Sequence, residues 1–202
     1  MTSSAFTAAR AGPNGAGHNS NASHNGADAP TGAGLTSTAS HNGEFDSARF
    51  RAVLGHFATG VVAITAIDPA TGAPTGLAAN AFTSVSLDPP LVAFCVAHSS
   101  STWPRLRTAG RLGVNMLTAD QLGVCRQLAA KGVDKFRGLP WSPSPGGAPL
   151  LADALAWIEC EIEAEHPAGD HVIVVCRVRH LASRVAQAPL LFFRGGYGSF
   201  AE

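Results

Sequence analysis

The chain has 202 residues, of which 46% are hydrophobic and 14% charged, so it can bury one core of ordinary size. Its 14 basic and 14 acidic side chains cancel, which argues against the polyanion-binding surfaces of nucleic-acid and anionic-membrane proteins. No apolar run has the length of a membrane span, and the N-terminus lacks the pattern of a signal peptide, so we expect a cytoplasmic protein that binds neither nucleic acid nor membrane.

The N-terminal segment, residues 1–43, consists mainly of Ala, Gly, Ser, Thr, Asn and His, with almost no large apolar side chains. Such a segment buries too little surface to offset the entropy of ordering, so it predicts a disordered tail before one domain at 44–202. Its scattered histidines, His18, His24 and His41, show no ligand geometry, and we predict no metal site in the chain.

The first predicted elements are a helix and a hairpin. Asp46 can cap the helix, and its apolar side chains recur at helical spacing. These side chains are Phe50, Val53, Leu54 and Phe57. The β-branched run 61–67 predicts a strand, and turn residues at 68–72 lead back into a segment that starts at Gly76, as in an antiparallel hairpin.

Small residues at 76–81 lie between two apolar, strand-like runs, which lets a flat or bulky ligand approach the backbone closely. Asn80 adds amide donors and a carbonyl acceptor, and hydroxyls follow at 83–86. Asp88, Pro89 and Pro90 then stop the segment, because neither proline has an N–H group to extend a ladder.

A hydroxyl-rich run, residues 99–102, follows the predicted strand 91–97 and precedes Trp103 and Pro104. This run predicts the start of a helix with Ser101 or Thr102 as its N-cap. Free N–H groups there would form an anion site without a lysine, and a plain capped helix is an equally good interpretation.

The next part of the chain predicts a strand at 111–116 and a helix opened by the capping-box pattern at 118–121, which continues to about Lys131. A long connection follows at 134–149, and loops of this length often carry function. The four cysteines show no ligand spacing and lie mostly in apolar runs, which predicts buried, reduced thiols.

From Leu155 the sequence alternates, with Glu159, Glu161, Glu163 and Glu165 on one face, which predicts a strand with one wet face. Further strands are predicted at 172–178 and, as the last, at 189–193. Six or seven strands with two or three short helices indicate an antiparallel barrel, and no strand is followed by the G-x-G-x-x-G pattern of a Rossmann fold.

Seven short motifs lie in order along the chain, at 50–61, 79–90, 100–103, 113–117, 134–138, 169–171 and 191–197. Together they resemble the short-chain flavin reductases, the reductase components of two-component flavin-dependent monooxygenases, and the resemblance covers about 45–200. It implies a mainly β fold, a Greek-key antiparallel FMN-binding split barrel, and a homodimer with flavin near the subunit interface.

The function implied by the resemblance is that of an NAD(P)H:flavin oxidoreductase. Such an enzyme reduces FMN or FAD by hydride transfer from NADH or NADPH and supplies reduced flavin to a partner monooxygenase. Two alternatives remain open: a flavin oxidase of the pyridoxamine-phosphate oxidase type, and a non-catalytic flavin- or haem-binding module.

Site residues also follow from the resemblance. Those implied for cofactor binding are Ala78, Ala79, Asn80, Ala81, Cys95, Val96, Ser100, Ser101, Thr102, Lys135, Phe136, Arg194 and Tyr197. Residues 78–81 would line the isoalloxazine ring, with Cys95 and Val96 approaching it from the next strand. The hydroxyls at 100–102 would hold the flavin phosphate.

The remaining implied roles concern the nicotinamide side and the reaction. Lys135 or Arg194 would lie near a phosphate or pyrophosphate, and Tyr197 would border the nicotinamide. His171 would be the catalytic residue beside the reacting rings, where it stabilises charge on reduced flavin or relays a proton. The alternative for His171 is a turn histidine that hydrogen-bonds the backbone.

Removal of the N-terminal segment tests its predicted disorder. A chain that starts at Glu44 should keep full activity and thermal stability, because residues 1–43 carry almost no apolar surface to bury. Activity assays and thermal unfolding of the full and shortened chains check this expectation. A melting temperature lowered by more than a few degrees would contradict it.

Overall fold

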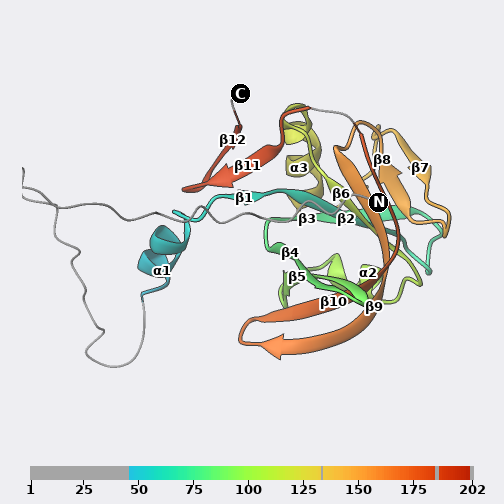
Figure 1. Cartoon of the computed structure of the whole chain (residues 1–202), viewed down its shortest axis with the longest axis horizontal. Coiled ribbons are helices and arrows are strands. Elements are labelled where there is room, and N and C mark those ends of the chain that lie inside the picture. Colours follow the sequence, from blue (N-terminus) through green and yellow to red (C-terminus); the bar gives the residue numbers. More distant parts are fainter. Residues whose placement is uncertain (1–45, 133, 185–186, 201–202) are drawn as a thin grey trace, which may run out of the picture. The chain divides into compact units, whose positions relative to one another are not determined.

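Antiparallel strands are the main secondary structure in the computed structural model, which describes residues 46–132, 134–184 and 187–200 (Figure 1). The tail predicted at 1–43 lies outside the described residues. The helices are α1 (Ser47–Leu54), α2 (Trp103–Arg107), the 3-10 helix η1 (Ala119–Gln121) and α3 (Leu122–Ala129). The predicted mainly β fold class is therefore confirmed.

The largest sheet has seven strands, and every neighbouring pair in it is antiparallel. In spatial order they are β3 (Pro74–Ala79), β2 (Val62–Ile67), β6 (Leu112–Met116), β9 (Ala156–Ala168), β10 (His171–Ser183), β5 (Pro90–Ala97) and β4 (Phe82–Leu87). Two small sheets join β1 (Thr59–Gly60), β11 (Leu190–Phe193) and β12 (Gly196–Ser199), and β7 (Trp141–Pro143) with β8 (Pro149–Leu151).

The two edge strands of the large sheet, β3 and β4, are consecutive in the chain, and only Asn80 and Ala81 separate them. Two residues bring the end of one strand within about 11 Å of the start of the next. The sheet therefore has to curl until its edges nearly meet, and residues of β3 indeed approach those of β5.

Both faces of the curled sheet are buried at strand β2. Val62, Ile64 and Ala66 point into the main core, which also contains Phe94 and Leu106. The residues between them face the other way: Ala63 belongs to a second cluster with Leu117, Cys125, Leu128 and Phe136. This second cluster packs α3 against the outer side of β2 and β3.

The predicted hairpin at the start of the domain is confirmed, and so is the predicted helix, except that it ends at Leu54 and leaves Phe57 outside. Asp46 caps α1, because its carboxylate accepts a hydrogen bond from the Ala48 N–H at 2.9 Å. The capping box before α3 is also present, with the Thr118 N–H donating to the Gln121 side chain at 3.1 Å. None of the side chains of α1 is buried, although its apolar spacing is that of a core-facing helix.

The predicted wet face of β9 is wrong at Glu159, whose side chain is fully buried. Its Oε2 accepts a hydrogen bond from the Gly146 N–H at 2.6 Å, and its Oε1 lies 3.2 Å from Nε of Arg111. Burial by itself raises the pKa of Glu159, but hydrogen bonds from Ser144 and Gly146, together with nearby positive charge such as that of Arg111, lower that pKa overall. The β7–β8 loop therefore covers a carboxylate that alternation alone placed in water.

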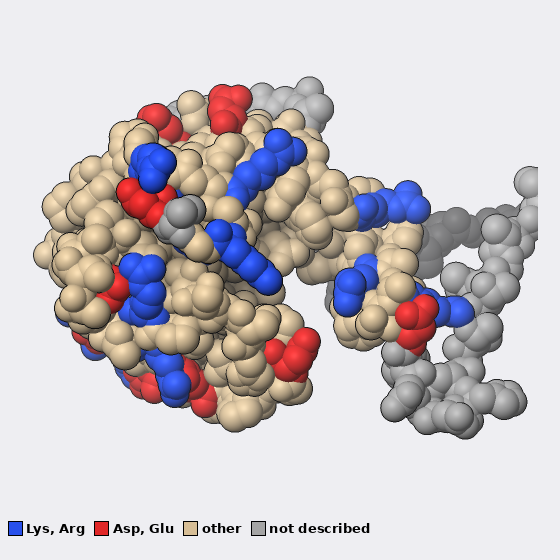
Figure 2. Space-filling model, turned by 180° about the vertical axis from the view of Figure 1, so that it is seen from behind, with Lys and Arg blue, Asp and Glu red and all other residues tan. Residues whose placement is uncertain are grey.

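The other glutamates of β9 are partly or fully exposed and are paired with arginines. Glu163 binds Arg177 of β10 through two hydrogen bonds of 2.8 and 2.6 Å. On the face shown in Figure 2, basic and acidic side chains are interspersed rather than gathered by sign. Such self-paired surfaces contribute little to stability and offer no extended charge of one sign.

The strand count from the sequence was too low, because strands of two to four residues are too short to show alternation. The structure adds β12 after the strand predicted to be the last, and β7 lies within the connection predicted at 134–149. All four cysteines are free, with Cys125, Cys160 and Cys176 buried and Cys95 partly exposed. No helix among the described residues is long and apolar enough to cross a membrane.

Asn115 ties three segments together inside the domain, where it has no exposed surface. Its amide donates hydrogen bonds to Thr65 Oγ1 at 3.0 Å and to the Ala63 carbonyl at 3.3 Å. Its Oδ1 accepts from the Leu151 N–H at 2.8 Å. One side chain thus joins β2 and β6 of the large sheet to β8.

Replacement of Asn115 by Ala should lower the free energy of unfolding by about 1–3 kcal/mol, because it leaves the buried Leu151 N–H without its acceptor. Asn80→Ala is the matched control: this exposed asparagine should change stability by no more than about 0.5 kcal/mol. Urea unfolding of both variants in the absence of ligand measures the difference. Equal effects at the two positions would contradict the role of Asn115.

Candidate functional site

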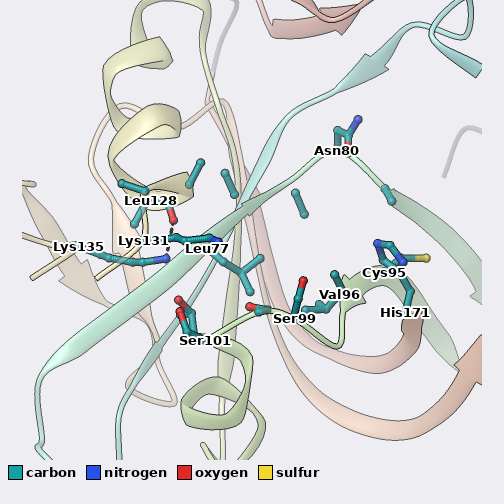
Figure 3. A pocket seen from close by; sticks show the side chains of 18 residues that line it. Leu77, Asn80, Cys95, Val96, Ser99, Ser101, Leu128, Lys131, Lys135 and His171 are labelled. Carbon is teal, nitrogen blue, oxygen red and sulfur yellow. Dashed lines mark hydrogen bonds between the residues drawn. The ribbon is translucent and has the colours of Figure 1, made fainter. Parts of the chain in front are cut away.

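The join between β3 and β4 borders a pocket of about 380 Å³, within the usual range for small-molecule sites (Figure 3). Its walls come from the end of β3, from β5 and the loop after it, from the end of α3, and from the first residue of β10. Ala78, Ala79 and Ala81 form one wall. Their small side chains leave the backbone open to close approach.

All but three of the site residues expected from the sequence line this pocket. They are Ala78, Ala79, Asn80, Ala81, Cys95, Val96, Ser100, Ser101, Thr102, Lys135 and His171. Sequence reasoning missed several others, notably Ser99 and Lys131. Ser99 extends the hydroxyl run and Lys131 ends the predicted helix, so both signals were present in the chain.

Phe136 lies in the second core cluster rather than in the pocket, with 6% of its surface exposed. Its ring packs edge-on against Trp141, with the ring centroids 6.4 Å apart, and lies against the backbone of Gly76. A Cβ atom at Gly76 would lie 2.9 Å from the Ile64 carbonyl oxygen and 3.3 Å from the Phe136 ring. Glycine is therefore needed here for packing.

Arg194 and Tyr197 also lie outside the pocket. The Arg194 N–H donates to the Gly55 carbonyl at 2.8 Å, and its guanidinium lies 5.9 Å from the centre of the Phe193 ring. Tyr197 lines a smaller hollow of about 140 Å³ that shares residues 78–80 with the pocket. Its hydroxyl lies 3.6 Å from the Cys125 sulfur, and the interaction with this thiol together with burial raises the pKa of Tyr197.

One end of the pocket carries cationic side chains, Lys131 and Lys135, near Ser99 and Ser101 (Figure 3). Lys135 Nζ donates to the Leu128 carbonyl at 2.8 Å, which anchors the side chain on α3. Burial and the charge of Arg105 lower the pKa of Lys135. This end of the pocket is suited to an anion.

Gln127 of α3 holds the segment that carries Lys135. Its amide donates to the Lys135 carbonyl at 3.0 Å and to the Arg137 carbonyl at 2.9 Å. Both bonds join α3 to residues that follow its end. The position of the lysine therefore depends on a side chain outside the pocket.

The hydroxyl-rich run 99–102, called the hydroxyl loop below, caps the helix α2 through a different residue than expected. Ser100 Oγ accepts from the Trp103 N–H at 3.2 Å, whereas Thr102 at the N-cap position makes no capping bond with its side chain. Neither Ser101 nor Thr102 is therefore used to start α2. The Thr102 side chain is 4% exposed and lines the pocket.

The other end of the pocket holds Asn80, Cys95 and His171 (Figure 3). Nδ1 of His171 lies 2.7 Å from Oδ1 of Asp170, and this hydrogen bond lowers the pKa of Asp170. Because an ionised carboxylate only accepts hydrogen bonds, Nδ1 carries a proton and Nε2 is left for a ligand. Among the described residues, no cluster of three or more His, Cys, Asp or Glu side chains could hold a metal ion.

The model of the flavin reductase like domain matches residues 54–201 of the chain. The chain belongs to this family. A flavin reductase of Pseudomonas putida is 49% identical over 156 residues, which are 77% of this chain and 91% of that protein. The reductase subunit HsaB of a flavin-dependent monooxygenase, from Rhodococcus jostii, is 43% identical over 152 residues, which are 75% of this chain and 77% of that subunit.

Solved structures of flavin reductase like proteins have the same fold. Nitrilotriacetate monooxygenase component B from Mycobacterium thermoresistibile has a TM-score of 0.73 and 39% identity, covering 76% of this chain and 86% of its own. The NADH:FAD oxidoreductase SgcE6 of Streptomyces globisporus has a TM-score of 0.73 and 36% identity, covering 78% of this chain and 94% of its own. The split-barrel fold expected from the resemblance is thereby confirmed.

Proposed function

We propose that this chain is an NAD(P)H-dependent flavin reductase that hands reduced FMN or FAD to a separate oxygenase component. One observation carries the proposal: a single pocket, in a member of the flavin reductase like family, combines a wall of small residues, a cationic end rich in hydroxyls, and an end with Asn80 and His171. Relatives of the chain are named flavin reductase and FMN reductase (NADH).

The donor set of the pocket fits a flavin. Alanines at 78, 79 and 81 leave a flat, accessible wall for the isoalloxazine ring, and Asn80 offers both donors and an acceptor to its polar edge. The hydroxyls of residues 99–102 and the two lysines suit the phosphate. Cys95 and Val96 of β5 complete the wall next to the ring.

Flavin and nicotinamide supply the hydride acceptor and donor when bound. The chain itself therefore has to position the two rings and exclude competing reactions, and it needs no strong acid or base. Residues 78–81 orient the ring and keep water from one side of it. His171, with Nδ1 held by Asp170, presents Nε2 to the pocket, where it holds or relays a proton as charge develops.

Delivery to an oxygenase is supported by the relatives. HsaB and Stc3 are named reductase subunits, and BorF is named the flavin reductase component of a two-component tryptophan halogenase. A protein that shares their family and much of their length is suited to the same role, in which it reduces flavin for a separate oxygenase. Its four free cysteines fit the reducing cytoplasm as the place of action.

A second copy of the chain is the proposed partner of the exposed apolar face around α1. Phe50, Leu54 and Phe57 are each more than half exposed, and they line a groove of about 800 Å³. This groove shares Asn80, Ala81 and Cys95 with the flavin pocket, so a copy seated there would complete the site. A two-fold contact is the commonest way to cover such a face.

The reductase activity is tested by mixing the purified chain with free FMN or FAD and following the absorbance of NADH and NADPH. Rapid oxidation that requires added flavin is the expected result. An oxidase of the pyridoxamine-phosphate type would retain its flavin and use little nicotinamide, and a binding module would use none. Failure with both nicotinamides and both flavins would refute the reductase.

Two substitutions separate flavin binding from hydride transfer. Thr102→Ala should raise the Michaelis constant for flavin most, because it removes a hydrogen bond to a charged group, worth about 1.5–3 kcal/mol. His171→Ala should lower turnover or weaken nicotinamide use while leaving flavin affinity nearly unchanged. Steady-state kinetics with each substrate varied in turn measures both.

The matched control for Thr102 is Thr108→Ala at the other end of α2, where the hydroxyl donates to the Arg105 carbonyl at 3.2 Å, outside the pocket. It should leave the flavin Michaelis constant unchanged. If His171→Ala retains wild-type kinetics and only loses stability, the histidine is structural.

Light scattering tests the dimer. The chain should have twice its monomer mass, and Phe57→Asp should shift it towards the monomer with loss of flavin turnover, because a charge on the exposed apolar face opposes its burial. Arg184→Asp, which alters an exposed ion pair outside the groove, is the control. A monomer that still reduces flavin would refute the claim that the dimer builds the site.

A further inference from the structure

A second hollow, of about 370 Å³, lies beyond the hydroxyl loop of the flavin pocket. Ser100 lines both hollows, while Ser99 and Ser101 face the flavin pocket and His98 and Pro104 face the second one. The loop 98–102 is thus the wall between two neighbouring cavities. No role for the second hollow follows from the flavin ring or from its first phosphate.

The wall between the hollows is fixed by backbone hydrogen bonds. The His98 N–H donates to the Asp170 carbonyl at 2.9 Å, which ties the loop to the turn between β9 and β10. The Ser100 N–H donates to the Ala97 carbonyl at 3.0 Å, and Ser100 Oγ caps α2. A ligand that extends past the hydroxyl loop therefore meets a preformed surface.

The lining of the second hollow combines flat apolar rings with one charged pair. Trp103 and Val172 are buried beneath it, and Pro104 and Pro167 contribute their rings. Arg107 Nε donates to Glu165 Oε1 at 2.9 Å, and a second guanidinium nitrogen lies 2.8 Å from Oε2. Paired in this way, the guanidinium is held in one orientation, with 60% of the Arg107 side chain exposed.

This chemistry suits a purine. Imidazole and guanidinium planes stack on nucleobases, and the exocyclic amine of adenine is a donor for a carboxylate such as Glu165. The net charge of the Arg107–Glu165 pair is zero, which suits a neutral base better than a further phosphate. The anionic part of the ligand is already provided for on the other side of the loop.

We propose that the second hollow binds the adenosine end of a dinucleotide, and that this dinucleotide is FAD. The inference rests on the proposed function, because it takes the flavin phosphate to lie at the shared hydroxyl loop. FMN ends at that phosphate, whereas FAD continues through a second phosphate to adenosine. The chain therefore distinguishes FAD from FMN through His98 and Arg107, on the far side of Ser100 from the flavin ring.

Kinetics with two flavins and two nicotinamides test the assignment. Arg107→Ala and His98→Ala should each raise the Michaelis constant for FAD about fivefold or more, since loss of one stacking partner weakens base binding by at least that factor. The constant for FMN should stay within about twofold of the wild type. Reduced nicotinamide mononucleotide, which lacks adenosine, should be used as before.

Arg179→Ala is the matched control, since Arg179 also pairs with a glutamate of β9, Glu161, but lies outside both hollows. It should change neither flavin constant. If the two variants weaken NADH and spare both FAD and reduced nicotinamide mononucleotide, the adenosine site stands but belongs to NADH, and its assignment to FAD is overturned. If no adenosine-containing substrate is affected, the site itself is refuted.

Binding measurements keep this test separate from the reductase activity. Equilibrium dialysis of the wild type with FAD and with FMN should show tighter binding of FAD, and Arg107→Ala should remove that advantage. This result would support the adenosine site even if the wild type turned over no flavin. Equal affinities for FAD and FMN in the wild type would overturn it, whatever the activity.

Discussion

The two-residue connection between β3 and β4 is the constraint on which the rest of the domain depends. Because Asn80 and Ala81 alone join the two edges of a seven-stranded sheet, the sheet has to curl, and its two edges meet at the site. The small side chains of Ala78, Ala79 and Ala81 line the pocket beside this join. The same short segment brings the two edges of the sheet close together and lines the pocket.

The charged end of the pocket depends on a second, independent part of the fold. The helix α3 is packed on the outer face of β2 and β3 by a cluster that includes Cys125 and Leu128. Its Gln127 then holds the backbone that presents Lys135. The proposed anion site would thus be attached to the outside of the barrel and the proposed ring site to its edge, so that substitutions could change one without the other.

The exposed apolar side chains of α1 link the proposed assembly of two copies to the pocket. A helix with core-type spacing and no buried residue is stable only when something covers it, and the groove beside it reaches Asn80 and Ala81. Catalysis and assembly would then share one segment. Destabilising the proposed contact between copies should therefore affect flavin binding before it affects the fold of each copy.

The sequence by itself determined the strand-rich architecture and the caps at Asp46 and Thr118, because caps, turns and alternation are local signals. Most of the pocket lining was implied by the family resemblance rather than by these local signals. The ordered motifs of the sequence were also enough to indicate the family. Only the tertiary structure decided that Glu159 is buried under a distant loop, that Phe136 fills the space above Gly76, and that Arg194 binds the Gly55 carbonyl. In each case the neighbour comes from another part of the chain, and burial depends on what folds over a residue rather than on the residues beside it.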